Sequence, residues 1–403
     1  MRRDLSIDLV RGLGVLMIAV DHLSGLLGLV ASAPITFPFI TWMRIGWSSA
    51  AEFFVFFSGF LVGLIYTQTL QKQGLPLTYA RAAHRSWQIY VANLLTLCAV
   101  VLLLRMPFFA SPPLEAATAL DAITGGGSIV GLVGFLTLRS APTFFEILHL
   151  YIALLLVAPL LLLVARKSVL AALACSVAVW ACVQWNHRFN LASWNFNPFA
   201  WQLVFVLGML CSVSNAFERL TKAFGRRTLL ISTGTLLALA FLVKMADKAN
   251  LVLPLIGQIK VAGISRTHVG VMVLLHFLVS VVFVMQLIPR GEALAKSALA
   301  RLVARVGQYS LECFCVSTVL VYAAAGWMAR SDRFDALSIF AVGMLIIALV
   351  CLWAVVMNWI KSQPWRSKPA ANAATVDTST VAKPTADARA HAADVRDISR
   401  EPA

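Results

Sequence analysis

Ten apolar runs follow one another along this chain of 403 residues, and each is long enough to cross a lipid bilayer as a helix. A soluble domain usually carries about a quarter charged residues, whereas this chain has 13% charged and 60% hydrophobic residues. Too few polar side chains remain to cover a water-facing surface. The sequence therefore predicts an all-α, polytopic membrane protein with spans at about 5–30, 46–69, 86–106, 142–165, 167–185, 198–215, 227–246, 267–289, 306–328 and 336–360.

Two further segments differ from these runs. A weaker apolar run at 119–138 is broken by Gly125, Gly126 and Gly127, so we interpret it as re-entrant or interfacial rather than as an eleventh span. Residues 1–360 are predicted to form one membrane domain. From about Lys361 the chain has almost no large apolar residue, which is typical of disorder. We therefore expect residues 361–403 to be a disordered cytoplasmic tail.

The net charge of +15 comes from cations that fall between apolar runs, as membrane topology would place them, and a nucleic-acid partner is disfavoured. With both termini cytoplasmic, fifteen cations before the tail face inward and nine face outward. The outer loop 244–266 breaks this bias with four cations and is a candidate for binding an anionic group. All seven cysteines lie within apolar runs, so we expect neither a disulfide framework nor a metal site.

The first apolar run concentrates ionisable side chains, which are costly inside a membrane and point to function. Arg11 and His22 are separated by about 20° around a helix and roughly 16 Å along it. Asp8 lies on the same stripe and can pair with Arg11; Asp21 does not share it. His22 adds an imidazole, which titrates near physiological pH, to this face of the helix. The plain structural interpretation is a histidine that is hydrogen-bonded between helices.

These residues also carry a resemblance. Residues 8–12 (DLVRG), with His22 following Arg11, resemble the first span of membrane acyltransferase-3 enzymes. Residues 51–59 (AEFFVFFSG), 148–152 (LHLYI), 196–202 (FNPFAWQ) and 307–311 (GQYSL) resemble the OpgC branch, which is associated with succinylating osmoregulated periplasmic glucans. The likeness covers roughly residues 3–360 and excludes the tail.

The resemblance implies an O-acyltransferase of the bacterial inner membrane. It would move a succinyl or acetyl group from cytoplasmic acyl-CoA, as co-substrate, to a periplasmic glucan or related glycan, without a tightly bound cofactor. Glu52 would then orient the His22 ring, as the third group of a triad does; alternatively, Trp47 or Ser48 satisfies this carboxylate. Guanidinium groups bind phosphate bidentately, although each is also explained as a topological anchor. The candidate donor-binding residues are Asp8, Arg11, Arg81, Arg85, Arg226, Arg227, Arg301 and Arg305.

The predicted outer loop between the fifth and sixth spans interleaves Trp with Asn, which suits stacking on sugar rings and bonding to hydroxyls. The alternative is an aromatic belt at the membrane surface. The candidate acceptor-binding residues are Trp185, Asn186, Trp194, Asn195, Asn197 and Trp201, joined by Tyr151 and His149 of the fourth span. A succinyl carboxylate would also need an outer cation, for which Arg44, Arg139, Lys260 and Arg266 are the options. His276 and Glu312 either line a tunnel or are core polar groups.

Two other classes compete with an enzyme. A transporter or flippase for a polar solute or lipid-linked glycan should have halves with matching broken helices, and no convincing pair is evident. A structural membrane subunit should tolerate the loss of His22. The preferred mechanism is direct attack on the thioester by a sugar hydroxyl that His22 deprotonates; a route through an acyl-His22 intermediate stays open.

Overall fold

The computed structural model describes residues 5–125, 129–185, 195–248, 263–288, 296–363 and 365, and these residues form helices and loops without a strand. The chain divides into two units, residues 1–358 and 359–403. In the second unit, the ring of Trp365 contacts that of Trp359 in the last turn before the tail. The predicted disordered tail lies almost wholly outside the described residues, so that prediction stays a prediction.

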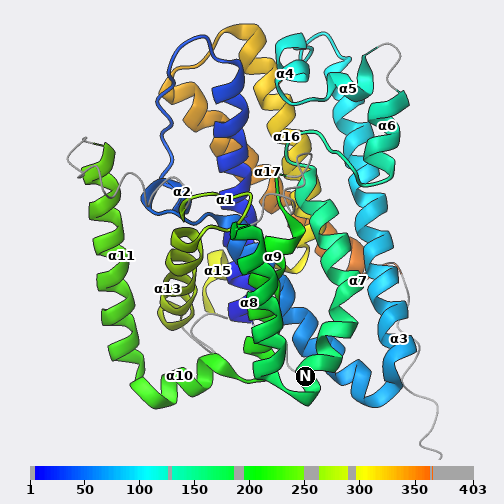
Figure 1. The fold of residues 1–403 in the computed structure, drawn as a ribbon. Coiled ribbons are helices and arrows are strands. Elements are labelled where there is room, and N and C mark those ends of the chain that lie inside the picture. Colours follow the sequence, from blue (N-terminus) through cyan, green and yellow to red (C-terminus); the bar gives the residue numbers. More distant parts are fainter. Residues whose placement is uncertain are drawn as a thin grey trace, which may run out of the picture. The chain divides into compact units, whose positions relative to one another are not determined.

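The helices follow one another along the chain, joined by loops (Figure 1). In order they are α1 (Leu5–Val30), α2 (Trp42–Ile45), α3 (Ala50–Leu104), α4 (Pro112–Ala117), α5 (Asp121–Thr124), α6 (Ile129–Leu136), α7 (Glu146–Lys167), α8 (Val169–Trp185), α9 (Pro198–Val213), α10 (Ala216–Phe224), α11 (Arg226–Lys248), α13 (Val271–Leu287), α15 (Ala298–Gln308), α16 (Ser310–Ser331) and α17 (Ala336–Ser362).

Six of the described helices are long and apolar enough to cross a membrane, namely α1, α3, α7, α11, α16 and α17. A seventh results if α9 and α10, which are bent by 70° at their junction, count as one span. Helices α8 and α13 are apolar but have 17 residues each. Every predicted span overlaps one of these helices. The all-helical membrane class is therefore confirmed, whereas the number of ten spans is not.

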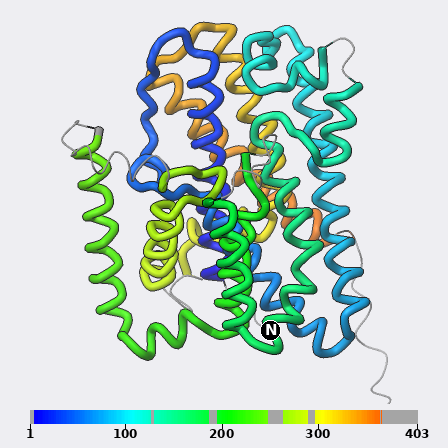
Figure 2. Tube along the Cα trace, in the orientation of Figure 1, coloured from blue at the N-terminus to red at the C-terminus, as the bar shows by residue number. Residues whose placement is uncertain are grey.

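Helix α3 contains two arms joined at Gly74, and it covers two of the predicted spans. Gly74 has a φ of 78°, in the left-handed region that glycine adopts without a Cβ clash. Pro76 follows at the start of the second arm, where it needs no backbone donor. The two arms run in opposite directions, as the tube in Figure 2 shows. Helix α3 therefore consists of two helical segments with a sharp bend between them at Gly74.

Glycines allow α1 and α3 to pack closely against their neighbours. A Cβ atom on Gly307 would collide with the Asp8 carbonyl, and one on Gly12 would collide with the Val303 carbonyl, so α15 lies directly against α1. Gly208 of α9 is similarly pressed against the backbone of the first arm of α3. Small residues of this kind let membrane helices approach each other. These contacts fix the frame around the cavity described below.

The segment predicted to be re-entrant or interfacial forms short helices. Helix α6 has eight residues, about 12 Å in length, and α5 has four. Neither is long enough to cross a bilayer. Figure 1 shows α4, α5 and α6 together near the end of the second arm of α3. Gly126 and Gly127 lie outside the described residues.

Candidate active site

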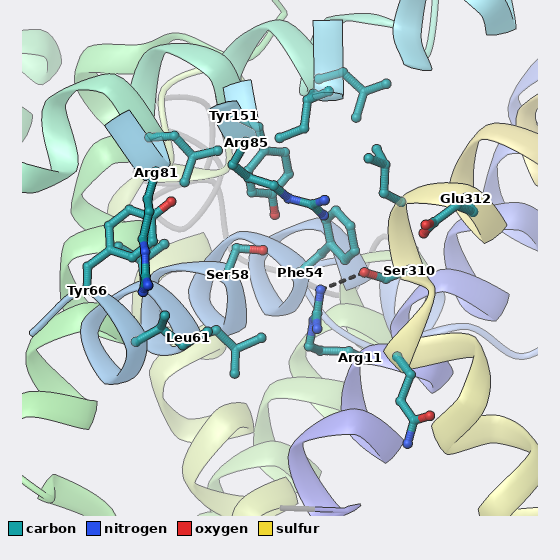
Figure 3. A pocket seen from close by; sticks show the side chains of 17 residues that line it. Arg11, Phe54, Ser58, Leu61, Tyr66, Arg81, Arg85, Tyr151, Ser310 and Glu312 are labelled. Atoms are coloured by element: carbon teal, nitrogen blue, oxygen red, sulfur yellow. Dashed lines mark hydrogen bonds between the residues drawn. The ribbon is translucent and has the colours of Figure 1, made fainter. Parts of the chain in front are cut away.

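A cavity of about 350 Å³ lies among α1, both arms of α3, α7 and the junction of α15 with α16. Three guanidinium groups line it, those of Arg11, Arg81 and Arg85. Figure 3 shows Arg11 and Arg85 reaching toward Phe54, with Arg81 on the side of Tyr66. The cavity therefore combines an apolar wall with concentrated positive charge.

Each of the three arginines donates a hydrogen bond to a side-chain hydroxyl or amide oxygen. Arg11 Nη2 donates to Ser310 Oγ at 2.5 Å (dashed in Figure 3). Arg81 Nη1 donates to Thr69 Oγ1 at 2.7 Å, a contact between the two arms of α3. Arg85 Nη1 donates to Gln88 Oε1 at 2.9 Å. The bend at Gly74 thus delivers Arg81 and Arg85 to the cavity, where Thr69 and Gln88 hold their side chains.

The structure brings together three of the eight predicted donor residues. Asp8 is buried, 3% exposed, where α1 meets α15. Arg226 Nε donates to the Gln286 carbonyl at 2.9 Å, which ties α11 to α13. Arg301 Nη1 donates to the Lys296 carbonyl at 3.1 Å. The predicted residues that do not line this cavity are Asp8, Arg226, Arg227, Arg301 and Arg305.

Two residues that the sequence singled out, Tyr151 and Glu312, also line this cavity. Tyr151, predicted among the acceptor residues, is 4% exposed, and its ring meets Phe54 edge to face at 5.3 Å between centroids. Glu312, for which a tunnel and a core role were both open, also lines the cavity. His149 lies two residues before Tyr151 and packs near Phe135, with ring centroids 5.3 Å apart. The packing of α7 thus separates Tyr151 from His149.

His22 lies further along α1, outside the lining of this cavity. Its ring stacks on Phe144 with centroids 3.6 Å apart and planes 7° apart. Phe314 meets it edge to face at 6.0 Å, and Phe314 in turn stacks with Phe54 at 6.2 Å. A series of ring contacts therefore connects His22 to the wall of the cavity. Its Nδ1 atom is buried and has no hydrogen-bond partner within the described residues.

Glu52 is fully buried at the start of α3 and bonds to Ser49. Its Oε2 accepts from the Ser49 backbone N–H at 2.8 Å and from Ser49 Oγ at 2.6 Å. Ser49 Oγ in turn accepts from the Ala51 N–H at 3.2 Å, so the two residues form a capping box. Between the described residues Glu52 and His22 there is no hydrogen bond. The pattern Ser49-Ala50-Ala51-Glu52 is a helix-start signal that the sequence analysis missed.

His276 holds the loop that leads into α3. Its Nδ1 lies 2.7 Å from Ser48 Oγ and accepts from the Ser48 backbone N–H at 3.3 Å. A backbone N–H can only donate, so Nδ1 is the acceptor in this pair. His276 also lines a second cavity, of about 400 Å³, between α11 and α13, so it combines a structural hydrogen bond with a place in a cavity wall.

The described residues of the predicted acceptor surface differ in their exposure to solvent. Trp185 is 84% exposed, whereas Trp201 is 1% exposed and Asn197 is fully buried. Asn197 Oδ1 caps α9 by accepting from the Phe199 N–H at 3.0 Å. Asn195 Nδ2 donates to Glu146 Oε1 at 2.5 Å. Asn186 and Trp194 lie outside the described residues, so the full surface is not described.

Side chains of α8 and α9 fix the segment that carries Arg266. Trp201 Nε1 donates to the Arg266 carbonyl at 3.0 Å, and Trp180 Nε1 donates to the Val269 carbonyl at 2.9 Å. Arg266 Nη1 donates to Met43 Sδ at 2.6 Å. Of the other cations considered for a substrate carboxylate, Arg44 bonds to Ser24 Oγ at 2.8 Å, Arg139 is exposed, and Lys260 lies outside the described residues.

Among the described residues, no three His, Cys, Asp or Glu side chains gather closely enough to hold a metal ion. A family model described as OpgC protein matches residues 3–362. No curated protein and no solved structure matches the chain. The family match covers well over half of the sequence and includes α1 through α17. The chain therefore belongs to the OpgC family, which implies a membrane acyltransferase type of function.

Proposed function

We propose that this protein moves a succinyl or acetyl group from acyl-CoA to a hydroxyl of a periplasmic glucan or related glycan. The observation that carries the proposal is the cavity lined by Arg11, Arg81 and Arg85 in a member of a membrane acyltransferase family. CoA carries several phosphate charges and a long, mostly neutral arm. A cavity with an apolar wall and a few placed charges suits such a ligand.

The phosphates bind Arg81 and Arg85, near the bend of α3. Each guanidinium group can give two parallel hydrogen bonds to a phosphate. The pantetheine arm then lies along apolar residues of α3 and α7, among them Leu61 and Leu148, which line the cavity. The thioester end points toward Phe54 and Arg11. Tyr151 and Ser58 line this end and supply hydroxyl groups.

The proposed topology has ten spans in the bacterial inner membrane with both termini in the cytoplasm. It counts the two arms of α3 separately, and it adds α8, α13 and the bent pair α9–α10 to the remaining long helices. The cation bias of the sequence supports this direction. The bend of α3 and its two arginines then face the cytoplasm, from which acyl-CoA enters.

The reaction is acyl transfer with His22 as general base. A sugar hydroxyl gives its proton to His22 while its oxygen attacks the thioester carbonyl. The C–S bond breaks, and the His22 imidazolium passes its proton to the leaving CoA thiolate, which restores the neutral base. The thioester reaches His22 only when the Phe54 and Phe314 rings move, because these rings connect the cavity wall to His22. The role of Glu52 in the proposal is structural: it caps the first turn of α3 and so helps to hold this helix in position.

The test is release of CoA by the purified full-length protein in detergent, with succinyl-CoA or acetyl-CoA and a glucan acceptor. We expect His22→Ala to abolish release while retaining the elution volume and melting temperature of the wild type. His391→Ala, in the tail, is the matched control and should keep the wild-type rate. Equal rates for His22→Ala and the wild type would remove His22 as the base. No release with either thioester would contradict an enzyme and favour a transporter.

A further inference from the structure

The His22 ring is held by aromatic rings instead of by a hydrogen bond at Nδ1. Nδ1 is buried and has no hydrogen-bond partner among the residues that the structure describes, while Phe144 covers one face of the ring and Phe314 meets its edge. A general base works only when its ring is oriented toward the proton that it takes. In a triad a carboxylate bonded to the second ring nitrogen provides that orientation. At His22 another group must provide it.

Phe144 lies in a strained loop just before α7. Its φ is 74°, in the left-handed region that a bulky side chain rarely adopts. Hydrogen bonds fix the loop on both sides of this residue. Before it, Thr143 N–H donates to the Thr118 carbonyl at 3.0 Å, and Tyr322 Oη donates to the Thr143 carbonyl at 2.9 Å. After it, Phe145 N–H donates to the Pro142 carbonyl at 3.1 Å. Strain that persists because its surroundings enforce it is frequent at functional sites.

Helix α1 also leaves room for the Phe144 ring. Gly25 follows His22 by about one turn, and a Cβ atom there would lie 3.1 Å from Phe144 Cζ. At Gly28, one turn further on, a Cβ atom would meet nothing within 4 Å. Gly25, the residue of α1 that faces Phe144, has no side chain, so the Phe144 ring fits over His22 and Gly25 together.

We propose that Phe144 is a positioning residue for His22, which fixes the imidazole ring by face-to-face stacking and stabilises the imidazolium formed when His22 takes a proton. The negative face of an aromatic ring attracts a cation placed over it. The inference rests on the proposed function for its kinetic consequences, whereas the stacking itself is independent of the reaction. It adds a residue that neither the apolar pattern nor the family resemblance points to.

The first test substitutes Phe144 and measures kcat and KM separately. We expect Phe144→Leu to lower kcat by roughly 2- to 30-fold, the range of a cation–π contact, with little change in the KM for acyl-CoA. Phe144→Tyr should restore most of kcat. Phe144→Gly removes the ring but suits the left-handed backbone, so it should fold as well as the wild type and still lose kcat. Unchanged kcat in both Leu and Gly variants would overturn the proposal.

Two control pairs separate positioning from general damage. Phe145→Leu changes the neighbouring aromatic residue, whose ring packs against Phe135 and Tyr322 and not against His22, and it should keep the wild-type kcat if it folds. Gly25→Ala pushes on the Phe144 ring and should lower kcat, whereas Gly28→Ala enters open space and should not. An equal effect of the two glycine variants would count against the proposal.

The electrostatic part has its own readout. Replacing Phe144 with phenylalanines that carry one, two and three fluorine atoms keeps the ring shape but weakens its negative face. We expect log kcat to fall stepwise with each fluorine. A flat series would refute stabilisation of the imidazolium and leave Phe144 a steric role alone.

Nuclear magnetic resonance of protein carrying labelled histidine distinguishes failure of this inference from failure of the proposed function. A ring stacked on His22 shifts the resonances of that imidazole upfield, and Phe144→Leu should abolish the shift. If the wild type shows no CoA release, the proposed function fails, and the shift alone decides the stacking. If release depends on His22 but neither kcat nor the shift responds to Phe144, only the present inference fails.

Discussion

The two ends of the candidate active site differ in how ready they are for a ligand. The cavity near the bend of α3 is open, at about 350 Å³, and its three arginines are already held by hydroxyl and amide groups. His22 instead lies among packed aromatic rings, and no other described residue hydrogen-bonds to its Nδ1. Under the proposed function, the donor end is preformed, whereas the base is enclosed by aromatic rings.

Helix α1 links the two ends, because it carries both Arg11 and His22. Its first half is locked to α15 through Gly12 and Gly307. Its second half is packed against the loop that carries Phe144. A change at one lock should therefore affect one end of the site more than the other, and the four predictions below follow this logic.

The largest effect is expected from closing the space between α1 and α15. Gly307→Ala places a methyl group against the Asp8 backbone, and overpacking of this kind costs about 1–3 kcal/mol of unfolding free energy. We expect a clear drop in the melting temperature. Gly14→Ala on α1 is the matched control, because a Cβ there meets nothing within 4 Å, and it should melt at or above the wild-type temperature. Equal melting of both variants would show that the α1–α15 lock carries no stability.

The next effect concerns the donor end alone. Arg81→Ala and Arg85→Ala each remove a guanidinium group from the cavity, and a hydrogen bond to a charged group contributes about 1.5–3 kcal/mol. We expect the KM for acyl-CoA to rise roughly ten-fold or more, with kcat nearly unchanged. Arg301→Ala, outside the cavity, serves as the control. A fall in kcat at constant KM would place these arginines in the chemical step instead.

A smaller effect is expected from substitutions of Glu52, which distinguish its capping of α3 from a role of its negative charge. Glu52→Ala removes the capping box and should cost about 1 kcal/mol of stability, with a matching loss of kcat through displacement of α3. Glu52→Gln keeps an acceptor for Ser49 and should retain both stability and kcat. Thermal melting and CoA release provide the two readouts. A similar loss of kcat in both variants would assign the carboxylate charge a direct part in the reaction.

The smallest effect is expected at the exposed tryptophan of the predicted acceptor surface. Trp185→Ala should leave the melting temperature unchanged, because the side chain is 84% exposed. Loss of a stacking contact worth about 0.5–1.5 kcal/mol should raise the KM for the glucan by roughly 2- to 10-fold. Trp87→Ala, which is 62% exposed on α3, is the control. An unchanged glucan KM would favour the aromatic-belt interpretation.

The positions of the helices could be predicted from the sequence because the thickness of the bilayer sets the length of the apolar run that crosses it. Breaks within the runs were harder to predict. The run 306–328 conceals the change from α15 to α16 at Tyr309, and the polar residues Gln308 and Ser310 on either side of this break line the cavity. Local polarity inside an apolar run thus indicated a site rather than a continuous span.

The site itself could be predicted only in part. Arg11 could be predicted because a charged residue inside an apolar helix is conspicuous. Arg81 and Arg85 could not be distinguished from the other loop cations in the sequence, because only the bend at Gly74 places them at the cavity. The side of α7 on which Tyr151 lies depends on packing against α3. Phe144 carries no signal in the sequence, because its contact with His22 joins residues more than a hundred positions apart.

The measurement that tests this account most directly is a cryo-electron microscopy structure of the protein with a non-hydrolysable thioether analogue of succinyl-CoA. The account predicts the analogue's phosphates beside Arg81 and Arg85, its arm along Leu61 and Leu148, and the Phe54 and Phe314 rings turned away from His22. An analogue bound outside this cavity, or an empty cavity at a saturating concentration, would contradict it.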